Sequence, residues 1–224
     1  VAVADLSEFW GGEKEIKLLD ANILACPDWE RLLGQLADSG AEVDFTQGLD
    51  VRLITPEKAE ALNKIKTKML HFAWDNPEDD LTPYFKRFLE LTTVKDKRKR
   101  RVYVLTNYGS THEQDLYRIY TLRDMGYDPY VMIYEKPTAP EETRRVQRWV
   151  NNKWLFHSVK DFKDYDPNYM RKGKQAEGLA AGRRGGYGKR NCSRIYNRKC
   201  HAVPCRFFRR CGGYGKQQRG YGLY

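Results

Sequence analysis

Residues 41–57 read AEVDFTQGLDVRLITPE and combine an apolar segment, a polar interruption and a helix start. The apolar, β-prone segment spans residues 43–54, and three polar residues interrupt it: Gln47, Asp50 and Arg52. Burying such groups costs several kcal/mol unless they are paired or line a site. Thr55 then places a capping hydroxyl before Pro56, which is typical of the first turn of a helix. The stretch therefore predicts a strand, a polar exit from that strand and a helix.

The same succession of strand and helix recurs through residues 1–170. Five apolar, β-prone segments are each followed by a helical pattern: Ile16–Asp20, Val43–Ile54, Met69–Trp74, Val102–Thr106 and Tyr130–Tyr134. Their starts lie roughly 30 residues apart, which is the length of a unit of strand, crossover helix and parallel strand. The predicted class is therefore α/β, with a parallel sheet and helices outside it.

Local signals predict where the helices begin and end. Thr82 precedes Pro83 in the same way as Thr55 precedes Pro56. Ser110 or Thr111 can cap a fourth helix, and Gly126 is a suitable stop signal for it. A first helix should start near Pro27-Asp28-Trp29. A fifth helix should begin near Pro140 and bury one apolar face, formed by Val146, Trp149 and Val150.

Polar residues at the strand ends point to a site. Parallel strands that are buried on both faces should be apolar throughout, yet several of these strands end in polar side chains. This arrangement is typical of a barrel whose site lies at the carboxyl ends of its strands. The candidate rim residues are Asp20, Asn22, Gln47, Asp50, Arg52, His71, Trp74, Asp75, Thr106, Asn107, Tyr134, Glu135 and Lys136. The alternative is that Asp50 and Arg52 only pair with their neighbours under a loop.

Charge and cysteines divide the chain near residue 170. Residues 171–224 hold 15 Lys and Arg against one acid, Glu177, so their net charge is +14. The whole chain has a net charge of +10, and residues 1–170 therefore carry −4. Cys26 stands alone in the first part, which favours a reduced thiol. The chain has no apolar run of about 18 residues and no signal-peptide pattern at its start, so we expect a cytoplasmic protein.

Five ordered motifs carry a resemblance to a known family. LLDANILACPDWERLL (18–33), VDFTQGLDVRLIT (43–55), LHFAWD (70–75), VYVLTNY (102–108) and GYDPYVMIYEK (126–136) resemble the second to sixth strand regions of radical S-adenosylmethionine (radical SAM) proteins. RWVNNKWLF (148–156) is similar to the continuation of a phage and bacterial group within that family. The resemblance covers about residues 1–165.

The resemblance implies a fold and a chemistry. The fold is a partial (β/α)6 TIM-type barrel that lacks its first strand. Radical SAM proteins bind a [4Fe-4S] cluster through CxxxCxxC after that strand, and this chain has no such motif, so the ligands are expected upstream of residue 1. The implied reaction is reductive cleavage of SAM to a 5'-deoxyadenosyl radical, with a reductant such as flavodoxin or ferredoxin and an unknown substrate. Some relatives also carry a cobalamin domain before the barrel.

The resemblance also suggests cofactor-binding residues. Asp20 and Asn22 occupy the place of the family's GGE motif, which contacts the SAM amino group. Arg52 would bind the SAM carboxylate, Asp75 and Asn107 the ribose hydroxyls, and Gln47 and Asp50 would face the cavity. Gly11-Gly12-Glu13 spells GGE but precedes its strand, so a turn is expected there. No catalytic residue and no metal ligand is assigned.

Some candidates have an equally simple structural interpretation. Cys26 is more typical of a small buried residue than of a ligand. His71 could be a hydrogen-bonded core histidine or a site residue. Trp74 and Tyr134 could stack on adenine or only pack.

Residues 171–224 differ from the rest in composition. GRRGGYGKR (182–190) and GGYGKQQRGYGLY (212–224) predict a disordered basic tail that either binds RNA or is a non-selected extension. This tail contains four cysteines, Cys192, Cys200, Cys205 and Cys211. Their spacing lacks the CxxC pairs that are typical of a zinc site. The alternative function is thus a noncatalytic α/β scaffold with a tail that binds nucleic acid.

Overall fold

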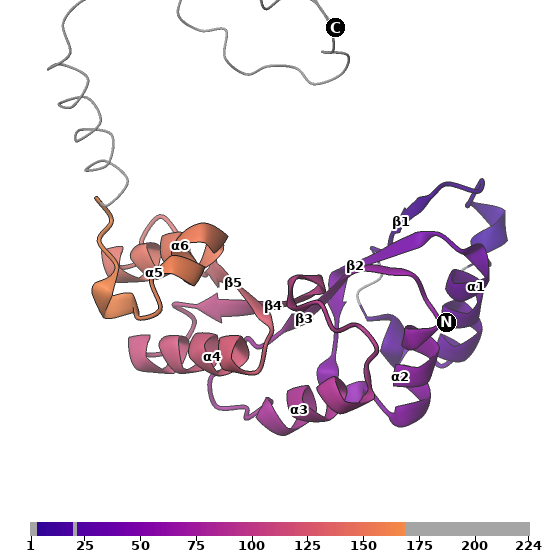
Figure 1. Ribbon diagram of the computed structural model, residues 1–224, viewed down its shortest axis with the longest axis horizontal. Coiled ribbons are helices and arrows are strands. Elements are labelled where there is room, and N and C mark those ends of the chain that lie inside the picture. Colours follow the sequence, from indigo (N-terminus) through magenta and orange to yellow (C-terminus); the bar gives the residue numbers. More distant parts are fainter. Residues whose placement is uncertain (1–3, 20–21, 169–224) are drawn as a thin grey trace, which may run out of the picture. The chain divides into compact units, whose positions relative to one another are not determined.

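The computed structural model describes residues 4–19 and 22–168, which all fall within one unit, Val1–Met170. The predicted tail, its four cysteines and Asp20 lie outside the described residues. The unit contains a five-stranded parallel sheet in the order β1-β2-β3-β4-β5 (Figure 1). Its strands are β1 (Glu15–Lys17), β2 (Glu42–Leu49), β3 (Thr67–Ala73), β4 (Arg100–Thr106) and β5 (Asp128–Ile133). The predicted α/β class is confirmed.

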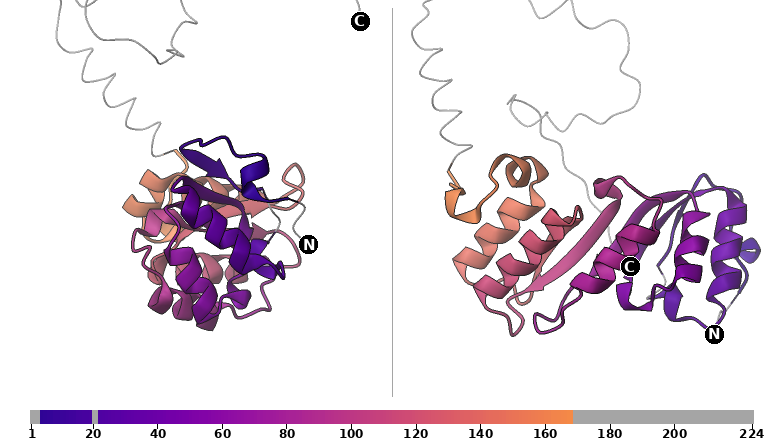
Figure 2. Two further views of the ribbon diagram at one scale, coloured as in Figure 1. Left: turned by 90° about the vertical axis from the view of Figure 1, so that its right-hand side faces the viewer. Right: turned by 60° about the horizontal axis from the view of Figure 1, so that its bottom comes forward.

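Each strand is followed by a helix, as the spacing predicted. The α-helices are α1 (Trp29–Ser39), α2 (Pro56–Asn63), α3 (Thr82–Leu91), α4 (His112–Asp124), α5 (Glu141–Asn151) and α6 (Lys153–Ser158). Short 3-10 turns are η1 (Leu6–Glu8), η2 (Ile23–Ala25), η3 (Val51–Leu53), η4 (Lys97–Lys99) and η5 (Phe162–Asp164). Helices α1 to α4 lie side by side along one face of the sheet (Figures 1 and 2).

The two faces of the sheet differ in burial. Seven strand residues on the helix-covered face are at most 1% exposed: Val43, Phe45, Leu70, Phe72, Val102, Val104 and Val131. Most alternate residues on the other face are only half-buried, among them Asp44, Arg101, Tyr103 and Tyr130. Because alternate side chains of a strand point to opposite faces, the sheet has one closed apolar side and one more open, polar and aromatic side.

Most helix starts follow the predicted signals. Thr55 caps α2 by accepting the Lys58 N–H, and Thr111 caps α4 in a capping box with Gln114. Helix α5 starts at Glu141 and buries the predicted apolar face. The prediction for Thr82 is wrong, because Thr82 is already the first residue of α3 and donates its N–H to the Asp80 carboxylate.

The strand expected over residues 43–54 is too long. Strand β2 ends at Leu49, where Asp50 accepts the Arg52 N–H and the chain turns into η3. Gly48 has a φ of +98°, and a Cβ at this position would lie 3.4 Å from the His71 carbonyl oxygen. The glycine is therefore needed for its backbone conformation, and a Cβ here would make only an ordinary contact with β3. Among the described residues, no helix has the length and apolar character required to cross a membrane.

Candidate functional site

A cleft of 340 Å³ lies at the carboxyl ends of β2 and β3. The connections that follow β1, β2 and β3 all contribute to it, because parallel strands place their carboxyl ends at one edge of the sheet. Its lining consists of Asn22, Gln47, Gly48, Leu49, Asp50, Arg52, Ala73, Asp75, Asn76, Asp79 and Leu81. The structure thus brings together five of the predicted site residues: Asn22, Gln47, Asp50, Arg52 and Asp75.

Two of the seven predicted cofactor-binding residues are not seen in the cleft. Asn107 follows β4 and has a φ of 61°, and its side-chain amide donates a hydrogen bond to the Tyr134 carbonyl at 2.9 Å. This contact joins the ends of β4 and β5 and does not line the cleft. Asp20 lies outside the described residues.

Asp50 and Arg52 form an ion pair at the wall of the cleft. Arg52 Nε and Nη2 each lie 2.9 Å from an Asp50 carboxylate oxygen, while the Arg52 main-chain N–H also donates to Asp50. These hydrogen bonds lower the pKa of Asp50 and raise that of Arg52. The simple pairing foreseen as an alternative therefore exists, and both side chains still face the cleft.

The pairing leaves one edge of the Arg52 guanidinium available. Asp50 binds the edge formed by Nε and Nη2, whereas Nη1 points toward Asp79 Oδ2 at 3.9 Å and makes no hydrogen bond within the described residues. The Arg52 side chain is 53% exposed. A carboxylate of a ligand can therefore approach the outer edge without breaking the Asp50 pair.

Asp75 is the third charged cleft residue that sequence position predicted. It lies two residues after the end of β3, and the atoms packed around its carboxylate desolvate it and raise its pKa. Asn76 and Asp79 belong to the same connection and also line the cleft. Sequence reasoning missed these two, although the acidic run NPEDD (76–80) directly after a predicted strand end was a usable signal.

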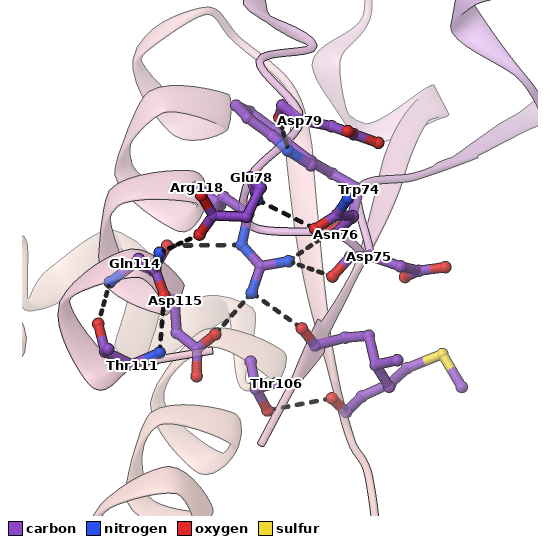
Figure 3. Close-up of polar contacts among 12 residues, drawn as sticks. Trp74, Asp75, Asn76, Glu78, Asp79, Thr106, Thr111, Gln114, Asp115 and Arg118 are labelled. Carbon is purple, nitrogen blue, oxygen red and sulfur yellow. Dashed lines mark hydrogen bonds and ion pairs between the residues drawn. The ribbon is translucent and has the colours of Figure 1, made fainter. Parts of the chain in front are cut away.

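A buried arginine holds this connection in place (Figure 3). Arg118 of α4 donates to the main-chain carbonyls of Trp74 at 2.7 Å, Asp75 at 2.9 Å and Leu105 at 2.9 Å. Its Nη2 also lies 2.6 Å from Asp115 Oδ1, and the Arg118 side chain is 1% exposed. The ends of β3 and β4 are thereby tied to one helix, which fixes the backbone that carries Asp75.

The cleft is acidic. Three lining carboxylates, Asp50, Asp75 and Asp79, face one guanidinium, Arg52, which gives a formal charge of −2. Asn22, Gln47 and Asn76 add amide groups that can donate or accept hydrogen bonds. Such a lining favours a small polar ligand with at least one cationic group.

Of the aromatic and histidine candidates, Trp74 and His71 are buried and Tyr134 is exposed. Trp74 is 1% exposed and its indole N–H donates to the Asp79 carbonyl at 2.8 Å, so it packs and cannot stack on a ligand. His71 is buried, with Nδ1 3.2 Å from the Phe45 carbonyl oxygen and 3.4 Å from Asp44 Oδ1. Burial lowers the His71 pKa, which favours the neutral ring. Tyr134 is exposed and packs edge-on against Tyr108.

The remaining predictions concern Gly11-Gly12-Glu13, Cys26 and metal ligands. The glycines lie in a bend before β1, where Gly12 has a φ of +95° and the Glu13 carboxylate accepts the Gly11 N–H, as expected for a turn. Cys26 is a half-buried free thiol. Within residues 4–19 and 22–168, no three His, Cys, Asp or Glu side chains are grouped to hold a metal ion.

The described unit is thus an α/β protein with an all-parallel sheet and an acidic cleft at the carboxyl ends of its strands. Comparison of the chain with family models, with curated proteins and with solved structures gave no match.

Proposed function

We propose that this chain is part of a radical SAM enzyme core and that the acidic cleft binds the charged end of S-adenosylmethionine. One observation carries the proposal. Asn22, then Gln47, Asp50 and Arg52, and finally Asp75 come from three successive strand ends and line a single cleft. These are also the positions to which the family resemblance assigns SAM contacts.

The charges of the cleft and of SAM are complementary. SAM carries an ammonium group, a sulfonium group and a carboxylate, so its methionyl end has a net charge of +1, against −2 on the cleft lining. Asp75 and Asp79 can attract the cations, and the outer edge of Arg52 can bind the carboxylate. Small-molecule sites usually measure about 300–1,000 Å³. The cleft falls within that range at 340 Å³.

The architecture supports assignment to a partial (β/α)6 TIM-type barrel. Strand order follows sequence order, each strand is followed by a helix, and one face of the sheet is closed by helices. The more open face, with Asp44, Tyr103 and Tyr130, would be the interior of that barrel. This placement puts the acidic cleft at the rim where such barrels have their sites.

The iron–sulfur cluster does not fit the described residues. A [4Fe-4S] cluster needs thiolate ligands held together, and residues 4–19 and 22–168 contain one thiol, Cys26. Under this proposal the cluster ligands lie outside residues 4–19 and 22–168. The residues described here bind and orient SAM.

Calorimetric titration of the full chain with SAM tests the proposal. We expect Arg52→Ala to weaken binding by about 1.5 to 3 kcal/mol, the range for hydrogen bonds to charged groups. Arg52→Lys should recover only part of this, because an ammonium cannot reproduce the planar fork. S-adenosylhomocysteine, which lacks the sulfonium charge, should bind more weakly than SAM to an acidic cleft.

Arg98→Ala is a matched control. Arg98 pairs with Asp96 in the same geometry as Arg52 with Asp50, with Nη2 to Oδ2 at 2.8 Å, but it lies before β4 and away from the cleft. It should leave SAM affinity unchanged. The proposal fails if the wild-type chain does not bind SAM at millimolar concentration, or if Arg52→Ala binds SAM normally while its unfolding free energy falls.

A further inference from the structure

A second cleft, of 290 Å³, lies at the amino ends of β4 and β5. Because the sheet is parallel, this is the edge opposite to the candidate SAM site. The turn η4 contributes one wall, and the end of α4 and the segment around α6 contribute the others. Its lining consists of Lys97, Arg98, Arg123, Asp124, Tyr127, Asp128, Phe156, His157 and Lys160.

Most basic side chains of the neighbouring run KDKRKRR (95–101) are bound to internal acceptors. Its lysines and arginines at four positions donate to internal groups: Lys95 to the Thr92 carbonyl, Lys99 to the Thr67 carbonyl, Arg100 to the Gly126 carbonyl and Arg101 to Asp128. Only Lys97 and Arg98 line the cleft. The run is therefore not a uniformly solvated basic strip, and its available charge is concentrated at one place.

The acids of the cleft are already neutralised. Asp128 pairs with Arg101 at 2.9 Å and with Lys153 at 2.5 Å, and Asp124 pairs with Arg123 at 3.3 Å. Lys97 and Lys160, in contrast, form no ion pair within the described part of the chain, and both are exposed. Two ammonium groups without counter-charges thus border one cleft.

Arg123 also lines the cleft and is held by aromatic rings. Its guanidinium lies 4.8 Å from the centre of the Tyr120 ring and 5.6 Å from that of Phe156, and it donates to the Lys160 carbonyl oxygen. Its side chain is 27% exposed. Stacking on two rings orients the planar group, so the cleft presents an oriented guanidinium beside the two unpaired ammonium groups.

We propose that this cleft binds a phosphate group, presented either by a free phosphate or mononucleotide or by a nucleic-acid strand. Phosphate oxygens accept hydrogen bonds from guanidinium and ammonium groups, and the cleft supplies both in a partly enclosed space. The site is independent of SAM binding, since it lies at the other edge of the sheet and shares no residue with the first cleft.

Backbone amide NMR of the full chain tests this site separately from the basic residues 171–224. Inorganic phosphate, AMP and a short single-stranded oligonucleotide are titrated at constant ionic strength, with chloride as reference. We expect saturable shifts at Lys97, Arg98, Asp124 and Lys160. Shifts with phosphate or AMP identify a small ligand, shifts there with the oligonucleotide alone identify a nucleic-acid contact, and no shifts there with any of the three overturn the proposal.

A double variant checks that the two free ammonium groups act in binding. Lys97→Ala/Lys160→Ala should weaken phosphate affinity about tenfold while the unfolding transition stays unchanged, because neither ammonium has a partner within the described residues. Lys14→Ala/Lys86→Ala is the matched control, since both lysines are exposed and distant from the cleft lining. Equal phosphate affinity in the two double variants would contradict the assignment.

Discussion

Removal of the Arg118 guanidinium should cause a large loss of stability. In Arg118→Met, three main-chain carbonyls at the ends of β3 and β4 lose their donor, and the Asp115 carboxylate loses its partner at 2.6 Å. Breaking a buried ion pair by removing one partner costs about 3 to 5 kcal/mol. Domains of this size are typically stable by about 5 to 15 kcal/mol, so the variant should still fold but with a much smaller margin.

Urea denaturation followed by tryptophan fluorescence measures this loss. Urea is preferred to guanidinium chloride because it adds no ionic strength, which would weaken the exposed ion pairs of the chain. Arg87→Met on the exposed surface of α3 is the control and should stay within about 0.5 kcal/mol of wild type. A loss below about 1 kcal/mol in Arg118→Met would refute the view that Arg118 is the main tie between these strand ends.

The direction of the stability change caused by Asp115→Asn separates the ion-pair contribution of Arg118 from its packing contribution. Asp115→Asn alone should destabilise the chain, because it weakens the pair with Arg118. In the Arg118→Met background the same change should recover part of the lost stability, because it removes an unpaired buried carboxylate. If Asp115→Asn destabilises both backgrounds equally, the two residues are not coupled and the loss in Arg118→Met comes from packing and carbonyls alone.

Four further substitutions test local features. Thr55→Ala should cost about 1 kcal/mol of unfolding free energy by removing the α2 cap, whereas Thr82→Ala, at a position that is not an N-cap, should cost less in the same urea assay. Because burial lowers the His71 pKa below 6.5, the folded state binds this proton less readily than the unfolded state, so stability should fall as pH drops below 6.5 and His71→Gln should reduce that fall. Because desolvation raises the Asp75 pKa above 3.8, the folded state binds this proton more tightly than the unfolded state. The resulting stabilisation is present at low pH and is lost as pH rises through the raised pKa. Asp75→Asn should remove this dependence in a pH series of unfolding curves and weaken SAM binding.

The sheet and most helix starts were predictable because their signals are local. A β-prone segment roughly every 30 residues leaves room for one crossover helix, and capping by Thr55 or Thr111 depends on residues within the same turn. The strand ends gave five of the cleft residues for a related reason. In a parallel sheet, sequence position after a strand already determines the edge at which a residue lies.

Long-range contacts to the main chain were not predictable. Arg118 bonds to carbonyls 43 and 44 residues earlier, and every residue has a carbonyl, so no residue type marks the partner. The indole of Trp74 is fixed in the same way by the Asp79 carbonyl. Thr82 was misassigned because Asp80, two residues earlier, satisfies its main-chain N–H, which the Thr-Pro pattern alone does not reveal.

The two Asp-x-Arg turns show why local geometry does not decide function. Asp50 and Arg52, and Asp96 and Arg98, form the same side-chain pair and the same main-chain hydrogen bond. In both turns the arginine lowers the pKa of the aspartate, to about 2 for Asp96. The pair therefore stabilises a backbone turn next to a strand. By itself it is equally compatible with SAM at the first cleft and with a phosphate group at the second.

The neighbours of each turn determine its chemical preference. Around Arg52, two further carboxylates, those of Asp75 and Asp79, make the cleft acidic, so a bound molecule must bring positive charge along with any carboxylate that Arg52 receives. Around Arg98, the acids of the lining are paired internally while two lysines are not, so the second cleft favours an anion. One local motif is thus placed at opposite edges of the same sheet, and the charges carried by distant segments give the two edges opposite selectivity.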